Sequence, residues 1–190
     1  MFNSKRSRVR AAAGVGMAAV VAAVGAVTFN ASAAEQSAVA VSAPDGRAVS
    51  IPGIPAAIKP PQGSKPIGAY VVASGTQTYT CANGSFAGAS VPEAQLIGTG
   101  GRVHHFAGPS WQSTRDGSLV KAAKEAESPR AGTIAELLLK VTEKSGSGVL
   151  SKATYINRLL TSGGTAPAGT CVDGTKKAVP YGAVYVFWTN

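Results

Sequence analysis

His104 and His105 are the two histidines of the chain, and histidine is the side chain best suited to acid–base chemistry near neutral pH. Consecutive residues of a strand point to opposite faces, so both cannot readily ligate one metal ion. His105 can be grouped with Asp116 and with Ser110 or Ser113 as a hydrolase-like trio, but no nucleophile-elbow motif accompanies them. His105 and Asp116 are therefore weak candidates for catalysis, and a hydrogen-bonded structural histidine is the favoured interpretation.

Paired carboxylates, metal ligands and cofactor motifs are sparse. A glycosidase needs two facing carboxylates, but Asp116 and Asp173 each precede a glycine, a pattern typical of turns. Two histidines and two cysteines offer too few well-spaced ligands for zinc. The glycines of 98–101 lack the third glycine of a dinucleotide-binding loop. We expect neither a metal nor a cofactor.

Aromatic and basic side chains are the candidates for binding. Trp111 follows Gly108-Pro109 and so falls near an expected loop, where an exposed ring could stack on a sugar. The competing interpretation, which is favoured, is that Trp111 fills one end of the core. Arg158 is a second weak binding candidate.

Cys81 and Cys171 are the only cysteines of the chain. An even number in an exported protein indicates a disulfide, and here only one intramolecular pairing exists. On the chain-entropy model, closing so long a loop stabilises the fold by about 4–5 kcal/mol. A structural disulfide is favoured over a redox or metal role.

The first 33 residues have the three parts of a secretory signal peptide. A basic start containing Lys5 and Arg10 precedes the uncharged run 11–29, and Ala31-Ser32-Ala33 ends it with small residues at the positions that signal peptidase reads. Ala and Gly dominate the run, which favours cleavage over a stable membrane anchor. The expected organisation is a leader at 1–33, a Pro- and Ala-rich tail or linker at 34–64 and one globular domain at 65–190, secreted from the cell.

Charge limits the expected partners. The whole chain has a net charge of +9, but without the four basic residues of the leader it carries 14 basic and 9 acidic residues, a net charge of +5. These cations are scattered, whereas nucleic-acid binders concentrate Lys and Arg in a stripe with stacking aromatics. We therefore expect a monomer that does not bind nucleic acid, with a cell-wall or extracellular polysaccharide as a candidate partner.

Local patterns favour strands after residue 65. Residues 66–73 form a bounded apolar run, 76–81 alternate, and Asn83-Gly84 follows as a hairpin turn. Residues 101–107, 111–114 and 154–160 are expected strands, and 181–188 are apolar on both faces, as in a buried central strand. The sequence predicts an all-β, disulfide-linked β-sandwich or barrel-like domain.

Two segments also fit helices. Residues 119–127 and 133–144 both place apolar residues at helical spacing, although the second also alternates as a strand does. Runs this short do not decide the matter, so an α+β fold is the alternative.

An ordered series of fragments resembles the secreted family called domain of unknown function 3455. The fragments are Gly75–Cys81, His105 with 107–111, 137–140, 147–159, 161–164, Cys171 and 179–181. The resemblance covers residues 65–190 and implies a mostly β secreted domain with no established activity. Ala135-Glu136 stands where relatives tend to have Pro-Trp, which favours a strand for this segment.

These observations lead to two hypotheses of function. The first is a non-catalytic extracellular or cell-surface binding module, with a polysaccharide or another envelope component as its ligand. The alternative is a small secreted hydrolase that acts through His105 and Asp116. The scarcity of carboxylates and histidines favours binding.

Overall fold

Strands dominate the chain in the computed structural model, which describes residues 39–42, 48–51 and 53–190. The predicted leader, residues 1–33, lies outside the described residues. Within the described part, no helix is long and apolar enough to cross a bilayer. In chain order the described elements are β1 Val39–Ser42, β2 Ala48–Ile51, the 3-10 turn η1 Ala56–Ile58, β3 Lys65–Thr80, β4 Val91–Gly98, β5 Gly101–Phe106, β6 Ser110–Ser113, β7 Leu119–Ser128, β8 Glu136–Ser145, β9 Tyr155–Gly163 and β10 Lys176–Thr189.

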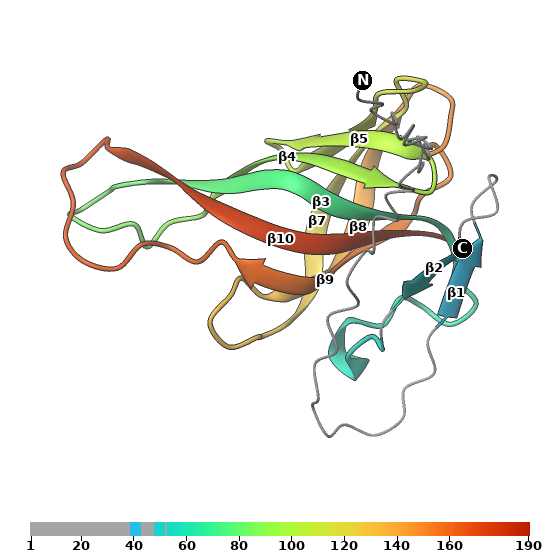
Figure 1. Ribbon diagram of the computed structural model, residues 1–190, viewed down its shortest axis with the longest axis horizontal. Helices are drawn as coiled ribbons and strands as arrows, with labels where there is room; N and C mark the ends of the chain where they lie inside the picture. The colour runs from blue at the N-terminus through green and yellow to red at the C-terminus, as the bar shows by residue number, and fades with distance from the viewer. Residues whose placement is uncertain (1–38, 43–47, 52) are drawn as a thin grey trace, which may run out of the picture. The chain divides into compact units, whose positions relative to one another are not determined.

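The eight strands from β3 to β10 form a closed antiparallel barrel. Each strand pairs with the next one along the chain, and β10 closes the barrel by pairing with β3 as well as with β9. Figure 1 shows β3 and β10 side by side as the longest strands of the barrel. The predicted all-β, barrel-like fold is confirmed, and the α+β alternative is wrong.

The two strand segments predicted at 66–73 and 76–81 belong to one long strand, β3. A register shift against β4 falls between Val72 and Ser74, which is where the two patterns meet. After β3, Asn83 and Gly84 have φ angles of 53° and 71°, and Ala82 and Ser85 form a bridge across them. This geometry is the left-handed turn predicted from the Asn-Gly pair.

Two segments could not be assigned from the sequence. Segment 119–127 lies in β7, and segment 133–144 lies in β8 from residue 136 onward. The pairing of β7 with β8 shifts register between Lys121 and Ala122 and again between Lys124 and Ala126. A shift of this kind breaks the two-residue period of a strand. The first shift places its extra residue in β8 and the second places one in β7. After the second shift Ala126 packs against a different cluster from Val120 and Ala122, so the apolar spacing of β7 imitates a helix.

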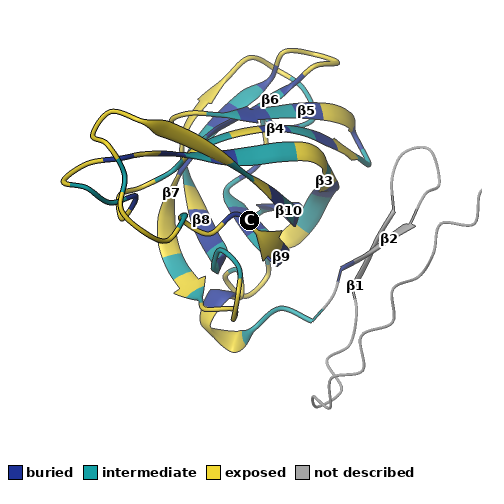
Figure 2. Cartoon of the chain, turned by 60° about the vertical axis from the view of Figure 1, so that its left-hand side comes forward, coloured by how far each residue is buried: buried dark blue, intermediate teal, exposed yellow. Residues whose placement is uncertain are grey.

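Interior side chains fill much of the barrel. Buried Tyr70, Leu96, Val103, Val120 and Phe187 belong to one core cluster drawn from most of the strands. Figure 2 shows buried and half-buried residues along the barrel strands, with exposed residues in the connecting loops and on parts of several strands, such as the second half of β8. Since alternate residues of a strand face inward, this cluster accounts for one face of each strand.

A second apolar cluster covers part of the outside of the barrel. Ile51 at the end of β2 and Ile58 of η1 are buried with residues of four barrel strands, among them Leu138, Val186 and Trp188. The Asn157 amide nitrogen fixes this segment by donating to the Ile58 carbonyl oxygen at 2.8 Å. The covering residues explain why β10 is apolar on both faces, as predicted for a buried central strand.

Cys81 and Cys171 form the predicted disulfide, with their Cα atoms 6.1 Å apart. Cys81 lies just after β3, and Cys171 lies in the loop before β10. The bond therefore joins the segment that follows β3 to the segment that precedes β10, at the end of the longest strand pair. Buried Tyr79 and Phe86 pack in the same cluster. The disulfide and these two aromatic side chains therefore stabilise the end of the β3–β10 strand pair that lies next to Cys81.

Candidate ligand-binding site

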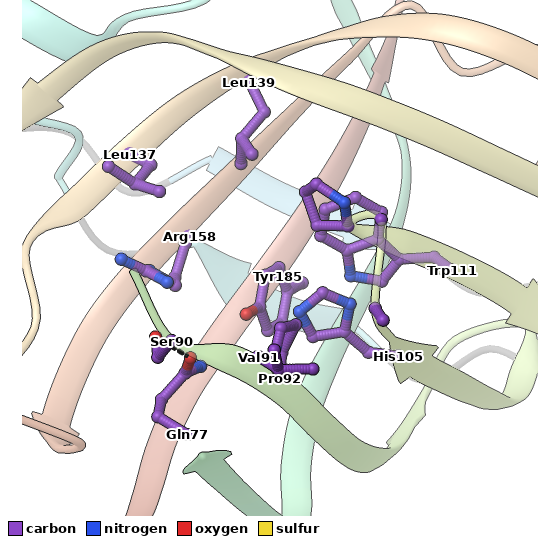
Figure 3. Close-up of a pocket in the computed structure, with 13 residues that line it drawn as sticks. Gln77, Ser90, Val91, Pro92, His105, Trp111, Leu137, Leu139, Arg158 and Tyr185 are labelled. Carbon is purple, nitrogen blue, oxygen red and sulfur yellow. Dashed lines mark hydrogen bonds between the residues drawn. The ribbon is translucent and has the colours of Figure 1, made fainter. Parts of the chain in front are cut away.

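A cavity of about 360 Å³ lies at one end of the barrel interior. We call it the barrel-mouth cavity (Figure 3). Its volume falls within the range of about 300–1,000 Å³ that is usual for small-molecule sites. The lining residues come from seven strands and two loops: Gln77, Ser90, Val91, Pro92, His105, Ala107, Gly108, Pro109, Trp111, Leu137, Leu139, Arg158 and Tyr185.

Strand register brings two rows of side chains to this cavity. In one row His105 on β5 pairs with Trp111 on β6. In the other, Arg158 on β9 pairs with Leu137 on β8 and with Tyr185 on β10. Directly paired residues on antiparallel strands project to the same face. Closure of the barrel therefore brings three of the four sequence candidates, His105, Trp111 and Arg158, to one cavity.

His105 is only 2 % exposed and stacks on the indole of Trp111. Its Nδ1 lies 2.8 Å from the carbonyl oxygen of Ser110. A carbonyl oxygen can only accept, so Nδ1 carries the ring proton and Nε2 remains an acceptor. Burial, and to a smaller extent the nearby Arg158 cation, lower the pKa of His105 to about 4. The ring is therefore neutral at physiological pH.

Asp116 does not join His105. Its Oδ1 accepts from the Ser118 hydroxyl at 2.6 Å and from the Ser118 amide at 3.0 Å, while Oδ2 accepts from the Val149 amide at 3.0 Å. These bonds, the Ser118 hydroxyl first, lower the pKa of Asp116 to about 2. Asp116 thus stabilises a turn and the loop facing it, which is the turn role that its Asp-Gly motif indicates.

The serines of the supposed trio are also bonded elsewhere. The Ser110 hydroxyl donates to the Ala107 carbonyl oxygen at 3.0 Å, and the Ser113 hydroxyl accepts from the Arg115 amide at 3.3 Å. With the His105 Nδ1 proton directed to a backbone carbonyl, no carboxylate orients the ring. The structure therefore does not assemble the predicted hydrolase-like arrangement.

Arg158 is half-buried and is held by the backbone. Its Nε and Nη2 donate to the carbonyl oxygen of Ala135 at 3.1 and 2.8 Å. This bond fixes the plane of the guanidinium and leaves the Nη1 hydrogens and one Nη2 hydrogen free of it. Among the described residues no Asp or Glu lines the cavity, and none forms an ion pair with Arg158. The cavity lining therefore contains a cation and no carboxylate; the nearby Glu136 carboxylate accepts from Arg130 and the Leu160 amide instead.

Two tyrosines adjoin Arg158. Their hydroxyl oxygens, on Tyr181 and Tyr185, lie 3.3 Å apart. Burial raises the pKa of both phenols, and Arg158 opposes that rise. Figure 3 shows the Tyr185 hydroxyl on the same side of the cavity as Arg158, Gln77 and Ser90, with the rings of His105 and Trp111 on the other side. The cavity has a polar side and an aromatic side.

Two buried donors at the cavity lack a partner in the described protein. Trp111 is 1 % exposed and its Nε1 has no acceptor within hydrogen-bond distance. Gln77 is 2 % exposed; its Oε1 accepts from the Ser90 hydroxyl at 2.6 Å, while its Nε2 makes no hydrogen bond. The Gln77 side chain also lies near the Tyr181 hydroxyl and opposes the rise in the pKa of that phenol. Trp111 is therefore the clearer case of an unpaired donor.

Sequence reasoning missed Gln77, Leu137 and Tyr185 as cavity residues. Gln77 carried one usable signal, because it is a polar residue on the same face of its predicted strand as Tyr79 and Cys81. For Trp111 the sequence offered a core position or a ligand-binding ring. The structure places it in the core cluster and also in the cavity lining. Within the described ranges, no group of three or more His, Cys, Asp or Glu residues is placed to hold a metal ion.

Comparison with known protein families gives one match. The family model described as "Protein of unknown function (DUF3455)" matches residues 94–189, which span β4 to β10 and contain most of the cavity residues. The resemblance inferred from sequence fragments is confirmed. No curated protein and no solved structure matches the chain.

Proposed function

The chain belongs to the DUF3455 family of proteins of unknown function, and we propose that it is a non-catalytic extracellular binding module that holds a small ligand in the barrel-mouth cavity. The observation that carries this proposal is the convergence of a few polar side chains, Gln77, Arg158 and Tyr185, on a concave, mainly apolar cavity. Such convergence is the usual mark of a small-molecule site. An eight-stranded barrel is also just wide enough inside to hold one small ligand.

The chemistry of the cavity favours binding over hydrolysis. A hydrolase needs a nucleophile, a base and a group that orients the base. The His105 ring in this cavity is neutral and donates to a backbone carbonyl. Asp116 lies outside the cavity and accepts hydrogen bonds from Ser118 and Val149. Stacked, neutral rings instead offer a flat apolar surface to a ligand.

The extracellular location rests on the predicted leader, and the disulfide supports it because such bonds persist in oxidising compartments. The concave shape of the site also limits the classes of ligand that it can accept. Trp111 lies at the bottom of a cavity rather than on a flat face, so a cell-wall polysaccharide would enter only by a chain end. A free small molecule fits the cavity more simply.

Equilibrium dialysis tests this function. The protein recovered from culture medium is dialysed against low-molecular-weight extracts and envelope oligosaccharides, and mass spectrometry follows retained compounds and products together. Retention of an unchanged compound is expected. Turnover of the compound, or failure to retain any compound, contradicts a non-catalytic binding module.

A pair of tryptophan substitutions locates the binding. Ala107 lines the cavity and is exposed, so Ala107→Trp should block entry and abolish retention. Ala123 is an exposed residue of β7 that does not line the cavity, so Ala123→Trp should retain as much ligand as the unaltered protein. Equal retention by both variants would mean that the compound binds elsewhere.

A further inference from the structure

The barrel-mouth cavity has a net positive charge. Among the described residues that line it, Arg158 is the only one with a permanent charge, and the nearest acidic residue along β8, Glu136, is paired with Arg130. Its influence reaches both sides of the cavity, because the guanidinium disfavours protonation of His105 and favours ionisation of Tyr181 and Tyr185. A half-buried cation in an apolar cavity attracts an anion more strongly than the same cation on the surface.

The free hydrogens of Arg158 suit a particular class of anion. The bond to the Ala135 carbonyl already fixes the guanidinium plane, so a ligand need not order the side chain. A planar guanidinium with donors on adjacent nitrogens matches the two oxygens of a carboxylate. The cavity thus presents an oriented donor group before the ligand arrives.

Neutral polar side chains accompany Arg158 on the polar side of the cavity. Gln77, Ser90 and Tyr185 line the cavity there. The Ser90 hydroxyl already donates to Gln77 Oε1 at 2.6 Å. Arg158 is therefore the strongest donor that the lining offers to an anion, because a charged donor forms a stronger hydrogen bond than a neutral one.

The remaining walls are apolar. Val91, Pro92, Leu137 and Leu139 line the cavity together with the stacked rings of His105 and Trp111. A sugar ring carries a hydroxyl on most of its carbons, and these walls offer few partners for them. A flat hydrocarbon ring would instead bury its faces against the leucines and the aromatic side.

From this geometry we infer that the ligand is a small carboxylic acid with an apolar ring, its carboxylate on Arg158 and its ring between the aromatic side and the leucines. The inference rests on the proposed binding function and specifies the ligand of the same cavity. At about 30 Å³ for each water of liquid, the cavity holds the equivalent of roughly a dozen waters. This size suits a fused two-ring acid.

The test compares an acid with its uncharged amide. Binding of 2-naphthoate and 2-naphthamide is measured by titration of the full secreted protein, followed by NMR of the backbone amides. The two probes have the same rings, so the ratio of their dissociation constants isolates the charge. We expect the acid to bind at least about tenfold more tightly, as a charge-assisted bidentate pair allows.

Substitutions of Arg158 test whether the guanidinium causes the difference between the dissociation constants of the acid and the amide. Arg158→Gln should bring the ratio close to one, and Arg158→Lys, which keeps the charge without the planar fork, should leave an intermediate ratio. The lysine variant also covers the case in which the glutamine variant fails to fold. Arg102→Gln is the matched control, because Arg102 is exposed and does not line the cavity. It should leave the ratio unchanged.

The remaining outcomes separate this inference from the proposed function. Equal binding of acid and amide, or preference for the amide, overturns the acidic ligand while leaving a binding module intact. Binding of neither probe also overturns the acidic, ring-containing ligand, and the dialysis experiment then decides separately whether the protein binds any small molecule. Glucuronate and glucose form a second pair. If glucuronate binds and naphthoate does not, the carboxylate specificity holds but the apolar ring is wrong.

Discussion

The imidazole of His105 lies almost parallel to the indole of Trp111, with ring centroids 4.3 Å apart and 5° between the ring planes. Tyr185 meets both rings edge-on. This packing surrounds the imidazole with aromatic surface and leaves its Nδ1 proton a single acceptor, the Ser110 carbonyl. A protonated ring would lose solvation here without gaining a carboxylate. His105 therefore serves the cavity as a neutral aromatic surface.

The stability of the protein should depend on this neutral ring. His105 has a pKa of about 4 in the folded protein, against 6.5 as its ordinary value. Between these two values the unfolded chain binds more protons, so stability is complete above pH 6.5 and falls as the pH drops toward 4. The loss over this window should be about 3 kcal/mol. His105→Gln should lack this part of the pH dependence.

Urea unfolding of the unaltered protein and of His105→Gln, measured from pH 7.5 to 4.5, checks this expectation. Carboxylates contribute equally to both proteins, so the difference between the two curves reports His105 alone. Parallel curves over the whole range would show that the imidazole titrates at its ordinary pKa.

The disulfide should contribute a large part of the stability. Cys81 and Cys171 are 90 residues apart, and closing a loop of this length is worth about 4–5 kcal/mol on the chain-entropy model. The double variant Cys81→Ser with Cys171→Ser should unfold at correspondingly lower denaturant concentration. Chemical denaturation of both proteins under non-reducing conditions measures the difference. A change below about 1 kcal/mol would mean that the bond constrains little of the unfolded chain.

Gly98 should be essential to the β3–β4 pairing. A Cβ atom at this position would lie 1.9 Å from the carbonyl oxygen of Ala69, which is backbone and has little freedom to move. Gly98→Ala should therefore destabilise the protein by at least about 1–3 kcal/mol. Gly88→Ala is the control, because nothing lies within 4 Å of its added Cβ. Similar melting temperatures for the two variants would contradict the observed register of β3 and β4.

The segment before β3 should stabilise the barrel from outside. Ile58 is fully buried in the outer cluster, so Ile58→Ala should cost about 2–5 kcal/mol. Val172 is 78 % exposed, and Val172→Ala should change stability by less than about 0.5 kcal/mol. Thermal unfolding of both variants gives the comparison. An unaffected Ile58→Ala variant would mean that the segment does not pack on the barrel in solution.

Local patterns predicted much of this fold. Alternation identified the second half of β3, the Asn-Gly pair identified its turn, and the cysteine count identified the disulfide. The patterns failed at β7, where an extra residue between Lys124 and Ala126 breaks the alternation. They were also ambiguous at β8, where Leu137 and Leu139 face the cavity but Leu138 packs in the outer cluster. Burial on both faces removes the contrast on which such predictions depend.

The cavity itself was beyond sequence reasoning. Trp111 and Arg158 could be named as candidates, but 47 positions separate them and nothing local relates one to the other. Their common cavity depends on the closure of the barrel through the pairing of β10 with β3. Asp116, although close to His105 in the sequence, is kept apart from it by β6: His105 pairs with Trp111 near the start of that strand, and Asp116 lies in the turn after its end.

The most direct measurement is a crystal structure of the protein with the compound that it retains in dialysis. We predict electron density for the compound in the barrel-mouth cavity, with an acidic group on Arg158 and a ring beside Trp111. Density on the outer surface instead, such as the shallower groove lined by Ser74 and Glu93 between β3 and β4, would contradict the central claim.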